Sequence, residues 1–424
     1  MQTVRKILPG GTALTGVYTD KFKNGLLSVN FISPLAKETA SAGSMLAPLL
    51  RRGSVEYPNM TVLASALGNA YGAAVEPVSR KLGGALGFGF VADFLDERLS
   101  PSGGLVAPML ETISNFTGAP ILENGAFPAA YVEEEKRSLS DRIRERINDK
   151  RSYAMRRLTE LMFCGSPRGI DPLGTLETVA ALTPESMTDF WRAAVKNSAL
   201  EIFYCGSGEP AAIEDLVYAA FPCSSSSDFS PLNLAKRREK AQIVTETMDV
   251  AQSVLTLGFT GGCLAGDENE AECMVFNAIW GGGLTSKLFM NVREKLSLCY
   301  YVSSGFDPFS GAYIASAGIA AENKEKTLDE IMLQLDACKR GEISADELKT
   351  AKLMLTSRLR AAADSPFTLE SYHINGAVSG ETSSLEEEMA EINAVTLEQV
   401  VETANAVKQD TVYFLTEKEG AENV

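Results

Sequence analysis

Histidine, the side chain that most hydrolytic and metal sites need, occurs only once in this chain, as His373. Catalytic zinc sites are usually built from two or three histidines together with a carboxylate or a thiolate. The triads of many hydrolases also place a histidine beside the nucleophile. One histidine leaves little room for either kind of site. We therefore interpret His373 as a residue that packs or forms hydrogen bonds.

The seven cysteines do not supply the missing ligands, because they are scattered, odd in number and form no C-x-x-C pair. This pattern is typical of reduced thiols rather than of a disulfide framework or a cysteine zinc site. The N-terminus lacks the apolar core of a signal peptide, and no apolar run is long enough to span a bilayer. The sequence thus predicts a cytoplasmic protein without a membrane partner.

The charge balance argues against nucleic acid as a partner. Lys and Arg number 39 against 55 Asp and Glu, which gives a net charge of −16. A chain this acidic repels polyphosphate. The glycine run Gly281–Gly283 is not a phosphate loop either, because no G-K-[ST] follows it. The length of 424 residues allows two or more domains, each with its own core.

A change of composition divides the chain into near-equal halves. Residues 221–242, FPCSSSSDFSPLNLAKRREKAQ, combine a run of serines, prolines and a charge cluster. Such a stretch is more easily solvated than packed, so we predict a linker here. The expected domains are residues 1–220 and residues 243–424.

The halves resemble each other in three pairs of segments. The segment ALTPESMTDFWRAAVKNSALEIFYCG, from Ala181, is similar to AVTLEQVVETANAVKQDTVYFL, from Ala394. Each has a threonine N-cap, an amphipathic helical pattern and then a β-rich run. The second pair aligns Lys136 with Lys352, and the third pair consists of two alternating, strand-like runs around a glycine-containing turn. We therefore predict an α+β fold made of two similar domains, each with helices packed on a mainly antiparallel sheet.

Two stretches carry a resemblance to a known family. WGGGLTSKLFMNVREKLSLCYYVSSGF, residues 280–306, contains a glycine-rich stretch, S-x-L-F and then R-E-K-x-x-L-x-Y. NGLLSVNFISPLAKETASAGSMLAPLLRRGSVEYPN, from Asn24, is similar to an opening strand and the helix after it. Both resemble the insulinase/pitrilysin family of zinc peptidases, which includes the mitochondrial processing peptidases. The resemblance covers nearly the whole chain and implies a duplicated metallopeptidase clamshell half.

The family's H-x-x-E-H zinc motif is altered at every position. When the chain is aligned on the Gly-Ser pair after the helix, Ser44 stands for the first histidine, Ala47 for the catalytic glutamate and Pro48 for the second histidine. Arg142 stands for the glutamate that is the third ligand. Serine is a poor neutral ligand, alanine cannot take a proton, proline has no ligand atom and arginine repels a cation. The first half thus carries a degenerate zinc motif, and we predict no metal and no catalytic residue in this chain.

The resemblance implies that a substrate-binding set is kept in the second half. In active members an arginine and a tyrosine bind and polarise the scissile peptide, and these correspond to Arg293 and Tyr300. A cation and a phenol suit a developing oxyanion. Gly281, Gly282 and Gly283 correspond to a mobile loop that guides substrate. On residue type alone, a solvated helix end, a half-buried strand tyrosine and a flexible turn remain open for these positions.

These observations leave three hypotheses of function. The first is a noncatalytic subunit of a heteromeric zinc metalloendopeptidase, which binds peptide and completes the site of a homologous, zinc-bearing partner. The second is a peptide-binding or scaffold protein of the same fold that assembles with such a partner or with itself. The third is an independent hydrolase with unrecognised ligands. We expect zinc only in the partner subunit.

Overall fold

The computed structural model describes residues 1–101, 103–224 and 230–417 of the chain. The chain forms two compact units, each of which contains a short segment from the other half of the sequence. Unit 1 consists of Met1–Ile143, Ile170–Pro231 and Ala363–Val378, and unit 2 consists of Arg144–Gly169, Leu232–Ala362 and Ser379–Val424. Part of the expected linker, residues 225–229, lies outside the described residues.

Unit 1 is built on a six-stranded sheet with the order β1-β2-β6-β3-β5-β4. Every neighbouring pair in it is antiparallel except β2 and β6. The strands are β1 (Gln2–Ile7), β2 (Ala13–Tyr18), β3 (Asn24–Pro34), β4 (Ala74–Leu82), β5 (Ala85–Leu95) and β6 (Ala199–Gly206). The helices are α1 (Ala40–Arg51), α2 (Met60–Asn69), α3 (Val106–Gly118), α4 (Ala129–Glu145), α6 (Leu176–Ala180), α7 (Pro184–Asn197), α8 (Pro210–Ala220) and α12 (Pro366–Ser379).

Unit 2 is built on a five-stranded sheet with the order β7-β11-β8-β10-β9. Its only parallel pair, among the described strands, is β7 with β11. The strands are β7 (Gln242–Thr247), β8 (Ser253–Thr260), β9 (Cys299–Asp307), β10 (Ala312–Ile319) and β11 (Lys408–Thr416). The helices are α5 (Lys150–Met162), α9 (Glu270–Trp280), α10 (Lys324–Lys339), α11 (Ala345–Ala362), α13 (Leu385–Ala394) and α14 (Leu397–Ala406), with short helices η1 (Pro167–Gly169), η2 (Phe289–Lys295) and η3 (Ala321–Asn323).

The two sheets share one pattern of five strands. In unit 1, β2 is parallel to β6, and β3, β5 and β4 then follow in antiparallel order. In unit 2, β7 is parallel to β11, and β8, β10 and β9 follow in the same way. The predicted duplication of a mainly antiparallel α+β domain is therefore confirmed.

Individual contacts repeat between the units as well. The ammonium of Lys136 on α4 donates to the carbonyl oxygen of Leu182 at 2.9 Å, just after α6. The ammonium of Lys352 on α11 donates to the carbonyl oxygen of Asn393 at 2.9 Å, at the end of α13. The next helix of each unit begins with a threonine capping box, Thr183 for α7 and Thr396 for α14.

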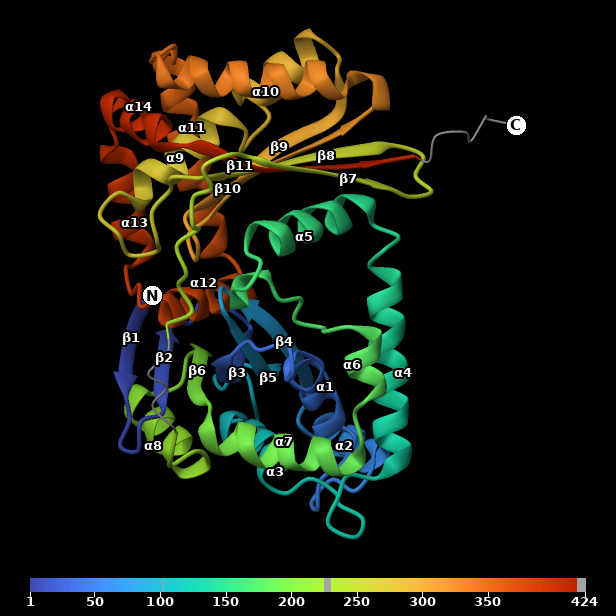
Figure 1. Ribbon diagram of the computed structural model, residues 1–424. Helices are drawn as coiled ribbons and strands as arrows, with labels where there is room; N and C mark the ends of the chain where they lie inside the picture. The colour runs from blue at the N-terminus through green and yellow to red at the C-terminus, as the bar shows by residue number, and fades with distance from the viewer. Residues whose placement is uncertain (102, 225–229, 418–424) are drawn as a thin grey trace. The chain divides into compact units, whose positions relative to one another are not determined.

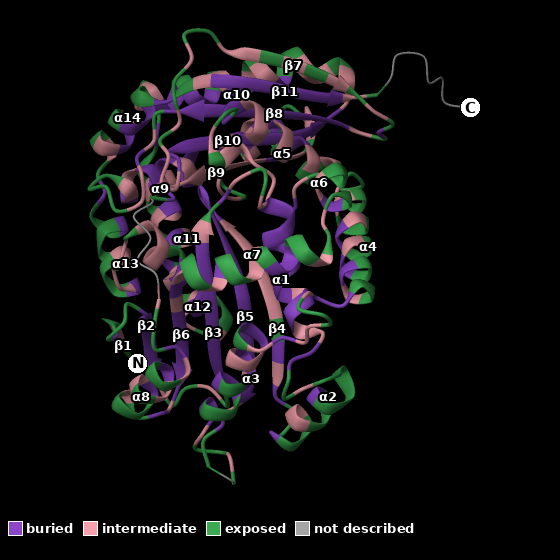
Figure 2. Ribbon diagram, turned by 60° about the horizontal axis from the view of Figure 1, so that its bottom comes forward, coloured by how far each residue is buried: buried purple, intermediate pink, exposed green. Residues whose placement is uncertain are grey.

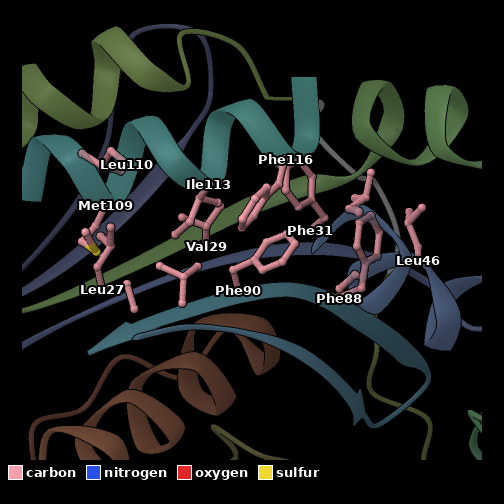
Figure 3. Packing of buried hydrophobic residues seen from close by; sticks show 14 of the residues in the cluster. Leu27, Val29, Phe31, Leu46, Phe88, Phe90, Met109, Leu110, Ile113 and Phe116 are labelled. Carbon is pink, nitrogen blue, oxygen red and sulfur yellow. The ribbon is translucent and has the colours of Figure 1, made fainter. Parts of the chain in front are cut away.

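The core of unit 1 lies between one face of its sheet and α1, α3 and α7. Apolar and polar residues alternate along β3, so Leu27, Val29 and Phe31 face the helices, whereas Ser28 and Asn30 face the other way. Strands β3 and β5 are accordingly buried along most of their length (Figure 2). The packed side chains include Leu27, Val29 and Phe31 of β3, Phe88 and Phe90 of β5, and Met109, Leu110, Ile113 and Phe116 of α3 (Figure 3).

Each unit covers the other face of its sheet with a helix from the opposite half of the sequence (Figure 1). In unit 1, α12 supplies Glu370, whose carboxylate lies 2.9 Å from the guanidinium of Arg80 on β4. In unit 2, α5 supplies Tyr153, whose hydroxyl donates to the carboxylate of Glu246 on β7 at 2.6 Å. None of the helices that the structure describes is both apolar enough and long enough to cross a lipid bilayer.

Candidate functional site

Helix α1 carries three of the degenerate zinc positions. Ser44 and Ala47 are fully buried, and Pro48 is half-buried inside the helix. A proline at this place gives no N–H to the helix and normally kinks or breaks it. Helix α1 nevertheless spans Ala40–Arg51, because neighbouring leucines on it pack into the core of unit 1.

The hydroxyl of Ser44 is already engaged by the protein itself. It donates to the carbonyl oxygen of Pro172 at 2.6 Å and lies 3.4 Å from the hydroxyl of Ser79 on β4. One turn earlier on α1, Ser41 donates to the carbonyl oxygen of Leu173 at 2.9 Å. The ammonium of Lys81 donates to the carbonyl oxygen of Ile170 at 2.7 Å. The backbone of Pro172 and Leu173 is thus hydrogen-bonded to the face of α1 on which a metal ligand would stand, and that of Ile170 is bonded to β4.

The fourth degenerate position, Arg142, is exposed on α4. A divalent cation needs a set of electron-pair donors, and these four side chains do not offer one. The hydroxyl of Ser44 is already used as a donor, Ala47 has a methyl group, Pro48 has a ring without a ligand atom, and Arg142 has a cationic guanidinium. Within the described part of the chain, no group of three or more His, Cys, Asp or Glu side chains is arranged to hold a metal ion. These residues do not fit zinc.

Arg293 lies in unit 2 on η2, a seven-residue π-helix. Its guanidinium carbon is 4.8 Å from the centre of the Phe289 ring, and its Nε is 3.6 Å from the Glu294 carboxylate. The Arg293 side chain remains 42% exposed. An aromatic ring beneath a guanidinium attracts the cation and limits its rotamers. Arg293 is therefore a partly ordered cation that stays open to solvent.

Tyr300 stands near the start of β9, the strand that follows η2, and is 71% exposed. The chain turns between the two elements at Ser297, whose φ is 53°. The Ser297 N–H donates to the Arg293 carbonyl oxygen at 3.0 Å, and the Leu298 N–H donates to the Val292 carbonyl oxygen at 3.0 Å. These bonds hold η2 against the start of β9, so Arg293 and Tyr300 come from adjoining elements.

The three glycines follow α9 and lie against β9 and α11. The Gly281 carbonyl oxygen accepts from the Ser304 N–H at 2.8 Å, and a Cβ at Gly281 would lie 2.5 Å from the Ser304 hydroxyl. Only glycine permits so close an approach. The Gly282 carbonyl oxygen accepts from Arg358 at 3.1 Å, and a Cβ at Gly283 would lie 2.6 Å from the sulfur of Met354.

His373, the single histidine, takes part in packing within unit 1, as its sequence context predicts. Its ring stacks on Phe203 with the ring centres 5.9 Å apart. Burial, and then the positive charge of Arg5, lower the pKa of His373 to about 4. At neutral pH the ring is uncharged and belongs to the contact between α12 and the sheet.

Two features near the predicted substrate-binding residues were not predicted from the sequence. The first is the Phe289 ring under Arg293, which the four-residue spacing on a helical turn could have indicated. The second is the Asn277–Ser304 pair beside the glycines, in which the Ser304 hydroxyl donates to Asn277 Oδ1 at 2.7 Å. No local sequence signal identifies that pair, because it joins a helix to a distant strand.

Known proteins resemble this chain along its whole length. Residues 181–355 match a family model described as Peptidase M16 inactive domain. A Bacillus subtilis (strain 168) protein named "Probable inactive metalloprotease YmfF" is 28% identical over 414 residues, which are 97% of each chain. A second protein of that organism, "Uncharacterized zinc protease YmxG", is 27% identical over 237 residues, 55% of this chain and 57% of that protein.

Solved structures agree with these relatives. A conserved protein from Enterococcus faecalis V583 superposes with a TM-score of 0.91 at 28% identity and covers 100% of both chains. A peptidase M16 inactive domain from Pseudomonas fluorescens superposes with a TM-score of 0.79 over 100% of both chains, and at 18% identity it supports the fold alone. The predicted fold and the predicted family resemblance are confirmed.

Proposed function

We propose that this chain, which is similar over residues 181–355 to the Peptidase M16 inactive domain and over 97% of its length to a probable inactive metalloprotease, is the noncatalytic subunit of a two-chain zinc endopeptidase. A homologous partner would carry the intact H-x-x-E-H motif and hold the zinc ion. This chain would bind the peptide and complete the partner's site with Arg293, Tyr300 and the Gly281–Gly283 loop.

One observation carries the proposal: the residues at the zinc-motif positions are replaced, whereas the residues at the substrate-binding positions are retained. All four metal and acid–base positions, Ser44, Ala47, Pro48 and Arg142, have lost the required chemistry. Arg293 and Tyr300, to which the resemblance assigns substrate binding, are retained, and both side chains are open to solvent.

The chemistry of the retained pair suits a supporting role. An arginine and a phenol both donate hydrogen bonds, and donors fixed in advance stabilise the negative charge that develops on a scissile carbonyl oxygen. The Phe289 ring under Arg293 and the turn at Ser297 fix part of this geometry before a peptide arrives. Such donors act without a metal of their own.

The relatives support a pair in which one chain holds zinc and the other does not. Bacillus subtilis has one relative whose printed name describes an inactive metalloprotease and another whose name describes a zinc protease. An organism that has this chain would then have a homologue able to supply zinc. The seven free cysteines support a reducing compartment such as the cytoplasm as the place of assembly.

The test is to recover the partner and then to measure cleavage. The tagged chain is purified from its native cell, and the bound proteins are identified by mass spectrometry. The proposal expects a homologue with an intact H-x-x-E-H motif, and a purified complex that cleaves unstructured peptides until a chelator is added. A complex that contains the homologue but is equally active when this chain is removed would contradict the proposal and favour the scaffold hypothesis.

A further inference from the structure

Strand β7 lacks a neighbour that its counterpart in unit 1 possesses. The shared five-strand pattern makes β7 equivalent to β2. In unit 1, β1 covers the outer edge of β2 in an antiparallel register from Gln2↔Tyr18 to Ile7↔Ala13. In unit 2, β7 pairs with β11 on one side, and no other described strand pairs with its outer edge. Among the described residues, this sheet edge is thus paired with a strand in unit 1 and not paired in unit 2.

The open edge carries few of the features that protect edge strands. Its register with β11 runs without a shift from Gln242 to Thr247. The strand QIVTET contains no proline and no lysine, and its one charged side chain, Glu246, is engaged by Tyr153 and Arg157 of α5, so this regular edge is a template for another strand. Its exposed residues Ile243, Thr245 and Thr247 are all β-branched, and Ile243 is 64% exposed; Figure 2 shows β7 coloured as exposed and intermediate rather than buried. β-Branched side chains favour cross-strand pairing.

The charges at the two ends of β7 complement each other. Before the strand, three exposed cations, Lys236, Arg237 and Lys240, outnumber the one exposed acid among them, Glu239, and after it the carboxylate of Asp249 is exposed. When two copies of one strand pair in antiparallel fashion, the start of each lies beside the end of the other. The cationic start of one β7 would therefore lie beside Asp249 of the second copy.

We propose that β7 is a self-association surface, at which a second copy of this chain adds its own β7 in antiparallel orientation. Such a contact is two-fold symmetric and uses the same residues in both copies. Residues on the same face of the two strands must lie opposite each other, so Thr245 meets Thr245 of the second copy, or a residue two positions away. The inference is independent of the proposed role in peptide cleavage.

A single pair of six-residue strands buries less surface than a permanent dimer needs, so the dimer is concentration-dependent. Analytical ultracentrifugation of the full chain over a range of micromolar concentrations is expected to show reversible monomer–dimer exchange. Thr245→Lys places like charges across the two-fold axis and is expected to give a monomer at every concentration. Thr245→Val keeps a β-branched side chain and is the matched control, with dimerisation as in the wild type.

A charge-reversal experiment separates loss of pairing from loss of folding. Thr245→Glu alone is expected to be monomeric, like Thr245→Lys, but an equimolar mixture of the two variants is expected to form a heterodimer. A disulfide provides a second readout: in a Cys164→Ser, Cys223→Ser background, Thr245→Cys should cross-link two chains under mild oxidation, whereas Thr3→Cys on β1 should not. A wild-type chain that is monomeric at all concentrations would overturn the proposal, and so would a dimer that persists in Thr245→Lys.

Discussion

The hydroxyl of Ser44, the residue that the sequence resemblance aligns with the first zinc ligand, donates a 2.6 Å hydrogen bond to the carbonyl oxygen of Pro172. The position has therefore acquired a structural role in place of a chemical one. Ser41 makes the same kind of bond to Leu173 one helical turn away. The face of α1 that carries Ser41 and Ser44 thus binds the backbone of its own chain.

The isolated chain is expected to bind no zinc and to cleave no peptide. The reason is that Ser44, Ala47, Pro48 and Arg142 provide neither a ligand set nor a general base. Metal analysis after incubation with zinc and desalting checks the first point, and digestion of unstructured peptides checks the second. Stoichiometric zinc together with chelator-sensitive cleavage by the pure chain would show that the third hypothesis, an independent hydrolase, is right.

Ser44→Ala is expected to destabilise the chain by about 1 kcal/mol, the usual net contribution of one hydrogen bond, with more if the Pro172 carbonyl stays unpaired. The free energy of unfolding, measured in urea, checks this. Ser138→Ala, on an exposed face of α4, is the matched control and should be neutral or slightly stabilising, since alanine is the better helix former. Equal effects of the two substitutions would show that the Ser44 bond contributes nothing.

The buried His373 predicts that the fold weakens in acid. Its pKa is about 4 in the folded chain and 6.5 in the reference state. Between these values only the unfolded chain binds the proton, so stability falls as the pH drops from 6.5 towards 4. His373→Phe keeps a ring stacked on Phe203 and removes the ionisable group, so this pH dependence of stability should disappear. The difference in melting temperature between variant and wild type should grow as the pH falls below 6.5, and a constant difference would refute the assignment.

Glu270, at the N-terminus of α9, predicts the opposite dependence of stability on pH: its contribution is lost as the pH rises rather than as it falls. Burial, followed by the nearby carboxylates of Glu388, Glu381 and Glu391, raises its pKa to about 7. A folded-state pKa above the unfolded value means that the contribution to stability is lost as the pH rises through 7.

Glu270→Gln is accordingly expected to raise the melting temperature at pH 8 more than at pH 5.5. Thermal unfolding followed by circular dichroism at both pH values measures this. The exposed Glu268, on the loop just before α9, gives the control, because Glu268→Gln should change stability little at either pH. If Glu270→Gln raised the melting temperature as much at pH 5.5 as at pH 8, the raised pKa of Glu270 would be contradicted.

The duplicated fold could be predicted because its signals are local. Thr183 and Thr396 each begin a helix with a capping box, and Lys136 and Lys352 occupy matching places on amphipathic helices. The exchange of α5 and α12 between the units was not predicted. An amphipathic pattern shows which face of a helix is buried but not which sheet covers that face.

The candidate site was predictable only where a motif carries it. Arg293 and Tyr300 were identified from the R-E-K-x-x-L-x-Y pattern, and the structure places them on adjoining elements. The π-helical turn was not predicted because local propensity does not indicate it, whereas the Phe289 ring under Arg293 was overlooked although its four-residue spacing indicates the contact. The bond from Ser44 to Pro172 joins residues that are far apart in sequence, and no pattern around either one indicates it.

The central claim is that this chain supplies donors to a partner's active site, and the kcat of the reconstituted pair tests it most directly. Tyr300→Phe removes one hydroxyl from an exposed side chain, so folding should be unchanged, and Tyr218→Phe is a control at another exposed tyrosine. Loss of an oxyanion donor typically costs about 2.7–4 kcal/mol, or roughly 100–1,000-fold in kcat. We expect such a loss for Tyr300→Phe, a similar loss with a raised KM for Arg293→Ala, and no change for Tyr218→Phe. Wild-type rates for both the Tyr300 and the Arg293 variants would contradict the account.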